Sequence, residues 1–260
     1  IFDVEQNKSR TPREGKITYF FTDVNGSEFS ETVTVYQAGA NLDITVNVPQ
    51  KGKLAETLAD YNSAEIGKLK ITGELGAEDF ITIRNMPNLI DLDISEVNIT
   101  TLPTKAFDES TNVENLILPN TLTTIGSNMF SKSALKSVII PNGVTTIESY
   151  AFFECSSLAT VTFEKGSNLK TIGEAAFSGN FHPVSQAYLS CPITSIEIPA
   201  SVETIEQEAF KNCSKLATVT FEKGSNLKTI GGGYNSSYYH GAFISCKALT
   251  SIEIPASVET

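Results

Sequence analysis

The chain has 260 residues, of which 40% are hydrophobic, so it can form one large domain or two small ones with a sizeable core. Its net charge of -11 disfavours binding to nucleic acid or to an anionic membrane surface, because both carry negative charge. No stretch approaches the roughly 20 apolar residues of a membrane-spanning helix. Four cysteines are too few for a disulfide scaffold of this length.

The first part of the chain predicts a tail and a β-hairpin. Residues 1–14 are polar and without periodicity. Residues 16–21 and 29–36 are rich in β-branched and aromatic side chains, which favours two strands. Asn25-Gly26 between them tolerates positive φ, which is typical of a tight turn. The acidic residues of this turn lack the ligand spacing of a calcium loop, so we predict a turn there.

The next segment predicts alternating strands and helices. Residues 42–48 alternate as a strand, and residues 52–61 place apolar side chains on one helical face. A short strand at 69–71 and a helix at 77–84 follow. We therefore expect residues 1–45 to form the tail-and-hairpin segment. Residues 46–88 are expected to cap the first rung of a solenoid.

The rest of the chain, residues 89–260, is repetitive. Residues 158–173 return letter for letter at 216–231, and residues 194–204 return at 250–260. The apolar residues that anchor the expected strands recur at spacings of 24, 22, 23, 35, 23 and 33. The base period near 23 lies within the roughly 20–29 residues of leucine-rich repeats. These anchors are Leu92, Leu116, Val138, Val161, Ile196, Val219 and Ile252.

Each repeat carries three apolar groups in a fixed order. The pattern L-x-x-V-x-I predicts a short strand, V-x-x-I predicts a corner, and an Ala-Phe pair predicts a one-turn helix on the opposite wall. One such rung cannot bury both of its faces alone, so stacked rungs share a core and their strands pair in parallel at ~4.8 Å. The Phe of the pair recurs at Phe107, Phe130, Phe152, Phe177, Phe210 and Phe243.

A resemblance to a known family follows from these letters. The unit I-x-I-P-x-x-V-x-x-I-x-x-x-A-F-x-x-C-x-x-L, at residues 196–216, closely resembles the BspA-like leucine-rich repeats of surface proteins from anaerobic gut and oral bacteria. The resemblance covers residues 89–260. It implies an α/β solenoid of ~23-residue repeats with short parallel strands. It further implies an exported or surface-attached protein with a role in adhesion, and it carries no catalytic residues.

The cysteines fall in four consecutive rungs near the same repeat position. One interpretation is a buried ladder of small apolar side chains. The other is a column of thiols close enough for disulfides or a metal. No C-x-x-C and no neighbouring His favours a metal, so no metal is expected. The four residues are Cys155, Cys191, Cys213 and Cys246.

Two insertions, at 178–190 and 232–241, explain the two long spacings. The second has the Tyr, Ser, Gly and Asn composition of binding loops. The functional hypothesis is a ligand surface on these loops. The alternative is that the insertions have no binding role. The solenoid would tolerate them, because the entropic cost of closing a loop grows only slowly with its length. The candidate ligand-binding residues are Phe181, His182, Tyr188, Tyr234, Asn235, Tyr238, Tyr239 and His240.

The outward row of the strands offers a second candidate surface. Two neighbouring exposed Ile residues can mark a partner site, although a solvated polar face is an alternative interpretation. Glu197 and Glu253 are predicted ~10 Å apart without enclosing walls, which does not suit an acid pair for hydrolysis. The row consists of Asp93, Ile117, Ile139, Thr162, Glu197, Thr220 and Glu253.

The sequence lacks the common catalytic signatures. It has no nucleophile elbow, zinc-protease motif, phosphate loop or dinucleotide fingerprint, so we do not expect an enzyme or a cofactor. We expect a non-catalytic cell-surface binding protein or adhesin that recognises protein partners, from host matrix or microbial surfaces. The alternatives are a structural spacer that displays another domain and a carbohydrate-binding module that uses the Tyr-rich loop.

The expected location is secreted or attached to the cell surface. The export signal or anchor would lie outside this chain, and no membrane insertion is expected within it. At the other end, we expect the last repeat to be cut at Thr260, before its Ala-Phe pair.

Overall fold

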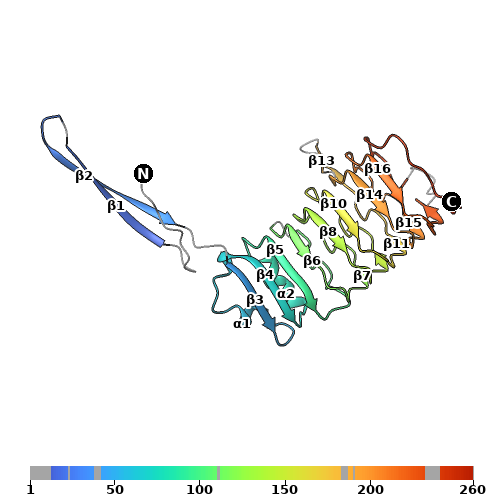
Figure 1. Ribbon diagram of the computed structural model, residues 1–260, viewed down its shortest axis with the longest axis horizontal. Helices are drawn as coiled ribbons and strands as arrows, with labels where there is room; N and C mark the ends of the chain where they lie inside the picture. The colour runs from blue at the N-terminus through green and yellow to red at the C-terminus, as the bar shows by residue number, and fades with distance from the viewer. Residues whose placement is uncertain are drawn as a thin grey trace.

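The protein is an elongated β-solenoid preceded by a hairpin, as shown by the computed structural model (Figure 1). The structure describes residues 13–22, 24–37, 42–109, 112–182, 187–189, 191–231 and 241–259. The solenoid has about seven turns of short parallel strands and few helices. The predicted fold class, a leucine-rich repeat solenoid with an N-terminal hairpin, is therefore confirmed.

The hairpin pairs β1 (Arg13–Thr22) with β2 (Glu28–Gln37) in antiparallel register. Gly26 has a φ of 82°, the conformation that the Asn-Gly turn predicts. Phe21 lies opposite Phe29, with ring centroids 5.5 Å apart. Phe20 is 78% exposed, so large apolar groups of this hairpin lie in contact with solvent.

Eight strands follow one another along one side of the solenoid. Their inward residues, such as Val138 and Val161, pair across neighbouring strands and are buried. We call the outward side of these strands the strand face. It is interrupted once, because β10 ends a six-stranded sheet and the next strand begins a separate pair. The strands are β3 (Leu42–Val48), β4 (Ile66–Gly73), β5 (Asp91–Val97), β6 (Asn115–Ile117), β8 (Ser137–Ile140), β10 (Thr160–Phe163), β14 (Ser195–Ile198) and β16 (Thr218–Phe221).

The V-x-x-I corners form a second parallel sheet, which the sequence predicted only as corners. Ile125 and Ile147 of this sheet are fully buried. Neighbouring rungs lie very close together at this sheet. A Cβ at Gly173 would lie 2.7 Å from the carbonyl carbon of Glu148 in the preceding rung, which explains the glycine there. The strands are β7 (Thr124–Ile125), β9 (Thr146–Ile147), β11 (Thr171–Ile172), β15 (Thr204–Ile205) and β17 (Thr229–Ile230).

The Ala-Phe pairs do not form the predicted one-turn helices, so that prediction is wrong. Residues in the left-handed region flank Phe152 on both sides, Tyr150 with φ 60° and Glu154 with φ 56°, and they interrupt a right-handed helix. The amides in these turns donate to the neighbouring rung instead. Phe130 N donates to Ala151 O at 2.8 Å, for example. We call this stack of turns the Phe wall.

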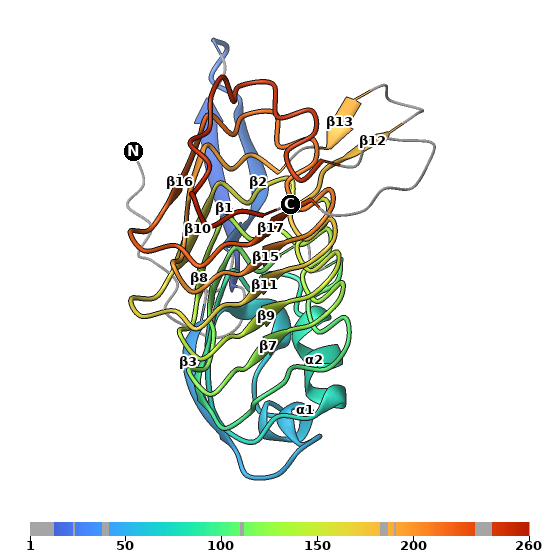
Figure 2. The same ribbon diagram turned by 90° about the vertical axis from the view of Figure 1, so that its right-hand side faces the viewer.

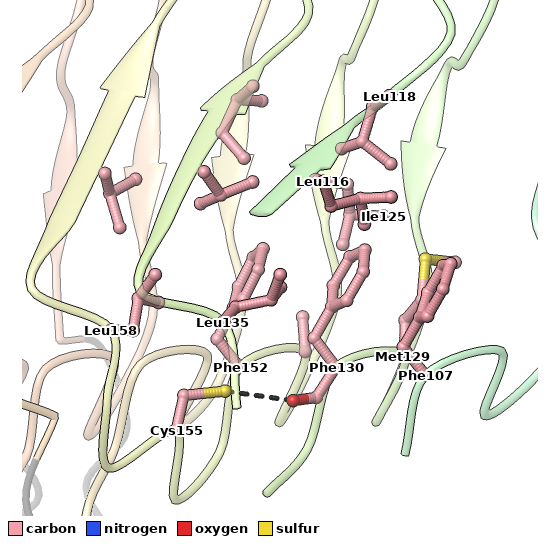
Figure 3. Close-up of a cluster of buried hydrophobic side chains, with 14 of the residues drawn as sticks. Phe107, Leu116, Leu118, Ile125, Met129, Phe130, Leu135, Phe152, Cys155 and Leu158 are labelled. Atoms are coloured by element: carbon pink, nitrogen blue, oxygen red, sulfur yellow. Dashed lines mark hydrogen bonds between the residues drawn. The ribbon is translucent and has the colours of Figure 1, made fainter. Parts of the chain in front are cut away.

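The phenylalanines of the Phe wall stack on one another through six rungs. Figure 3 shows Phe107, Phe130 and Phe152 of this stack. Centroids of Phe130 and Phe152 lie 4.9 Å apart with an interplanar angle of 10°. Phe152 is fully buried between its two neighbours. Such pairs contribute about 0.5–1.5 kcal/mol each beyond the burial of their surface, so the stack is a main source of cohesion between rungs.

The N-terminal cap covers the first ring of this stack. Helix α2 (Ala77–Arg84) has the predicted bounds, and its Phe80 packs edge-to-face on Phe107 at 5.6 Å. Helix α1 (Leu54–Thr57) is shorter than predicted, and a 3₁₀ helix, η1 (Ser63–Glu65), follows it. Figure 2 shows α1 and α2 on the opposite side of the solenoid from β3, β8 and β10.

A buried carboxylate joins the two helices of the cap. Asp79 is 1% exposed. Its Oδ2 accepts hydrogen bonds from Gly52 N and Gly76 N, both at 2.7 Å, and its Oδ1 accepts one from Leu54 N at 2.8 Å. A carboxylate that satisfies three backbone donors fixes the loop before α1 onto the start of α2.

We expect Asp79→Ala to lower the free energy of unfolding by about 2–4 kcal/mol, because it leaves these backbone donors without an acceptor. Urea unfolding followed by circular dichroism measures the change. Glu78→Ala, at the neighbouring exposed position, is the control and should change stability by less than about 0.5 kcal/mol. Equal losses in the two variants would contradict this role.

We expect Phe152→Ala to lower the free energy of unfolding by about 3–5 kcal/mol, because it opens a cavity in the middle of the Phe stack. Phe153→Ala is the matched control, since Phe153 follows directly in the chain and is only half-buried. Its loss should be clearly smaller in the same urea titration. A loss of similar size at both positions would show that the stack contributes little.

Candidate functional site: the strand face

The strand face carries the predicted outward residues in one row along the solenoid, which is interrupted between β10 and β14. Asp93 lies opposite Ile117, and Ile139 lies opposite Thr162, in parallel register. Ile117 and Ile139 are 55% and 59% exposed and come from adjacent strands. They form a two-residue apolar spot. All other members of the row are exposed except Asp93, which is half-buried.

Ion pairs flank the apolar spot toward the N-terminus. Lys70 lies 3.5 Å from Asp93 and 2.6 Å from Glu96. Burial opposes ionisation of Asp93, but hydrogen bonds from Ser95 and the charge of Lys70 outweigh it, so the pKa of Asp93 lies below its usual value. Lys70, Asp93 and Ile117 are among the residues that line a shallow depression of about 330 Å³. The sequence did not single out Lys70, because the residue belongs to a strand before the first repeat.

Toward the C-terminus the strand face is acidic. Glu197 lies opposite Thr220, and Glu253 follows on the last rung. Glu222 is fixed in place, because its Oε2 accepts a hydrogen bond from Ala200 N at 2.9 Å. Glu197 and Glu253 are both exposed, with a strand between them, so the arrangement has none of the enclosure that tunes an acid pair.

On the strand face, the outward positions of the described strands β4, β5, β6, β8, β10, β14 and β16 carry no aromatic side chain. The second outward row consists of Lys68, Asp91, Asn115, Ser137, Thr160, Ser195 and Thr218. Sugar rings usually pack on aromatic rings, and single-stranded nucleic acid also needs them for base stacking. The described part of the strand face therefore offers no aromatic stacking platform.

The first insertion contains a small antiparallel hairpin. Strand β12 (Asn180–His182) pairs with β13 (Ala187–Leu189), and Phe181 lies opposite Tyr188 in the register. Figure 2 shows β12 and β13 on the other side of the solenoid from β8 and β16. The second insertion, with Tyr234, Asn235, Tyr238, Tyr239 and His240, lies outside the described residues. The loop hypothesis therefore stays a prediction.

The four cysteines are free and buried, which confirms the ladder interpretation. Each thiol donates a hydrogen bond to a carbonyl of an earlier rung. Cys155 Sγ donates to Phe130 O at 2.9 Å (Figure 3), and Cys213 Sγ donates to Phe177 O at 3.2 Å. Burial raises the pKa of Cys155 to about 12 and that of Cys246 to about 11. A hydrogen bond with Cys191, together with burial, raises the pKa of Cys213.

We expect the native protein to react very slowly with Ellman's reagent at pH 8, because thiols with raised pKa values carry little thiolate there. After unfolding without reductant, four thiols per chain should react. Fewer than three would show that some of the cysteines form disulfides. A burst of reaction before unfolding would contradict the buried ladder.

The described residues were compared with the requirements of a metal site and of a membrane-spanning helix. Within the described ranges, no three His, Cys, Asp or Glu side chains gather in a way that could hold a metal ion. Among the described helices, none is long and apolar enough to cross a membrane.

The repeats match a family described as "BspA type Leucine rich repeat region". Six copies cover residues 82–182 and 184–260, which is well over half of the chain. The chain belongs to the BspA-type leucine-rich repeat family. Its membership agrees with the resemblance drawn from the repeat unit and accounts for the parallel strands. No curated protein matches the chain.

The chain is similar to several solved structures at low sequence identity. A leucine-rich repeat protein from Bacteroides ovatus is 21% identical with a TM-score of 0.50, over 87% of this chain and 54% of that one. The pneumococcal vaccine antigen PcpA is 17% identical with a TM-score of 0.43, over 74% of this chain and 38% of that one. A leucine-rich cell surface protein from Faecalibacterium prausnitzii is 18% identical with a TM-score of 0.29, over 93% and 89%. This chain thus spans about half the length, or less, of the first two proteins.

Proposed function

We propose that this protein is a non-catalytic, cell-surface binding protein that recognises a protein partner through the strand face. The observation that carries this proposal is the apolar spot of Ile117 and Ile139, more than half exposed on adjacent strands. Neighbouring exposed apolar side chains on a rigid sheet can mark a partner site. Covering the exposed half of each isoleucine contributes about 1–1.5 kcal/mol.

The rigidity of the scaffold supports a recognition role. Beneath the apolar spot, Leu116 and Val138 are buried, and the register of β6 and β8 holds the two isoleucines side by side. A surface that is already ordered loses little conformational entropy when a partner binds. The ion pairs around Lys70 and the acidic end at Glu197 then set the orientation of the partner.

The specific binding role that we propose is adhesion at the bacterial surface, to host matrix or to another microbe. Its support is membership in the BspA-type family, together with the resemblance of the repeat unit to repeats of bacterial surface proteins. The loop insertions remain a second proposed contact surface, on the strength of the Tyr-rich composition of residues 232–241.

The test is a binding screen against immobilised extracellular matrix proteins and bacterial cells. We expect the double variant Ile117→Asp and Ile139→Asp to lose about tenfold or more in affinity for whichever surface binds the unmodified protein. Ile81→Asp is the matched control, because Ile81 is 50% exposed on α2, away from the strand face.

Two outcomes would contradict the strand-face assignment. One is a double variant that binds as well as the unmodified protein. The other is a loss that occurs only when residues 232–240 are replaced by Gly and Ser, which would transfer the site to the second insertion. Binding to none of the surfaces would favour the structural-spacer alternative.

A further inference from the structure

One rung of the Phe wall carries two aromatic side chains outside the buried stack. Tyr150 and Phe153 flank Ala151 and Phe152 in the chain, and their ring centroids lie 5.5 Å apart with an interplanar angle of 80°. Tyr150 is 37% exposed and Phe153 is half-buried, whereas Phe152 is fully buried. We call Tyr150 and Phe153 the aromatic pair. Part of its surface is accessible to a partner.

The neighbouring rungs carry small side chains at the same two positions. The hydrogen bonds from Phe130 N to Ala151 O and from Phe152 N to Ala176 O fix which residues are equivalent. Because the equivalent side chains are small, none of them covers the rings of the aromatic pair. They are Asn128 and Ser131 in the preceding rung, and Ala175 and Ser178 in the following rung.

The aromatic pair lies among carboxylates. The Tyr150 hydroxyl donates a hydrogen bond to Glu174 Oε1 at 3.4 Å. Burial raises the pKa of Tyr150, and the negative charges of Glu174 and Glu208 raise it further. Glu154 follows Phe153 directly and is half-buried.

Two of these carboxylates have no cation beside them. Lysines of nearby rungs form ion pairs elsewhere, since Lys132 pairs with Glu109 at 3.5 Å and Lys211 pairs with Glu208 at 2.8 Å. In the part of the chain that the structure describes, no Lys or Arg forms an ion pair with Glu154 or Glu174. Uncompensated negative charge therefore lies next to the exposed rings.

The aromatic pair faces away from the strand face. Helix α2, whose Phe80 packs on the first ring of the Phe wall, lies on the opposite side of the solenoid from β8 and β10 (Figure 2). A partner that covers Ile117 and Ile139 therefore leaves the aromatic pair free. The two surfaces can be tested separately.

We propose that the aromatic pair, together with Glu154 and Glu174, binds an arginine side chain of a basic polypeptide. The face of an aromatic ring attracts a cation. A guanidinium is planar, so it stacks on a ring while its N–H groups donate to a carboxylate. On a chain of net charge -11, the uncompensated carboxylates select a basic segment over a neutral one. The inference goes beyond the proposed function, because it assigns a second contact site and the chemistry of its ligand.

The test uses the whole chain and a fluorescein-labelled peptide, Gly-Arg-Gly-Arg-Gly-Arg-Gly, at about 150 mM salt, which screens long-range attraction. We expect saturable binding by fluorescence anisotropy. The same peptide with citrulline, which has nearly the shape of Arg without its charge, should bind at least about tenfold more weakly. Equal binding of the two peptides, or no binding of the Arg peptide, would overturn the proposal.

Variants of Tyr150 test the contribution of the ring. Tyr150→Leu should weaken the Arg peptide about three- to tenfold, because it removes the cation–π contact. Tyr150→Phe keeps the ring, so its affinity should stay within about twofold of that of the unmodified protein. Circular dichroism checks that both variants are folded. Equal affinities of the two variants would refute the aromatic pair as the site.

Variants of the carboxylates test the contribution of charge. Glu174→Gln should weaken the Arg peptide about threefold or more. Glu78→Gln is the matched control, because it makes the same change at an exposed position on α2. Equal losses in the two variants would show that only the net charge of the chain attracts the peptide, and would contradict the proposal.

Two further measurements separate this inference from its alternatives. Xylohexaose, a neutral sugar chain, should not displace the Arg peptide. Displacement that Tyr150→Leu abolishes would assign the rings to a glycan and would overturn the proposal. The Ile117→Asp and Ile139→Asp double variant should keep its affinity for the Arg peptide even where it loses its matrix or cell-surface partner. Failure of the peptide to bind a protein that still binds that partner would contradict this inference alone.

Discussion

The structure depends on the stacking of each rung on the next. A single rung has too little interior to bury its own apolar residues, so Phe152, Ile147 and Val138 become buried only because neighbouring rungs supply the same residues at the same height. The backbone follows the same rule. Phe130 N donates to Ala151 O rather than to its own turn, and the two sheets are ladders between rungs. A rung is stable only to the extent that its neighbours match it.

That constraint also determines where functional surfaces can arise. The exposed side chains Ile117, Ile139 and Glu197 lie outside the core, so they can vary without loss of the fold. Turns can lengthen provided that the Phe wall and the second parallel sheet, which the corners form, stay in register. The sheet formed by the corners continues from β11 to β15, while the strand ladder stops between β10 and β14. The apolar spot is a product of this tolerance.

Much of the fold and some of the candidate site could be predicted from the sequence. The sequence pattern predicted the inward anchors such as Val161, the recurring Phe positions, the bounds of α2 and the exposed isoleucines. Each of these features depends on local alternation or on the repeat period. The one-turn helices were a wrong prediction, since the left-handed conformation of residues such as Tyr150 is imposed by hydrogen bonds to the next rung. Two of the three bonds accepted by Asp79 join segments more than twenty residues apart, and no local pattern indicates them.

The sequence by itself determined the solenoid, its period and its family. Similar rungs can bury their apolar residues only by stacking, and the spacing of the repeats gives the number of residues in each rung. It also determined that the cysteines would be buried, since their position follows that of Phe152 and Phe210 in each rung. Only the tertiary structure decided which rungs join the strand ladder. Residues 194–204 and 250–260 have the same letters, yet the first copy pairs with β16 and the described residues of the second form no strand. Strand formation depends on where the flanking segments place a rung, and that placement is not a property of the strand's own residues.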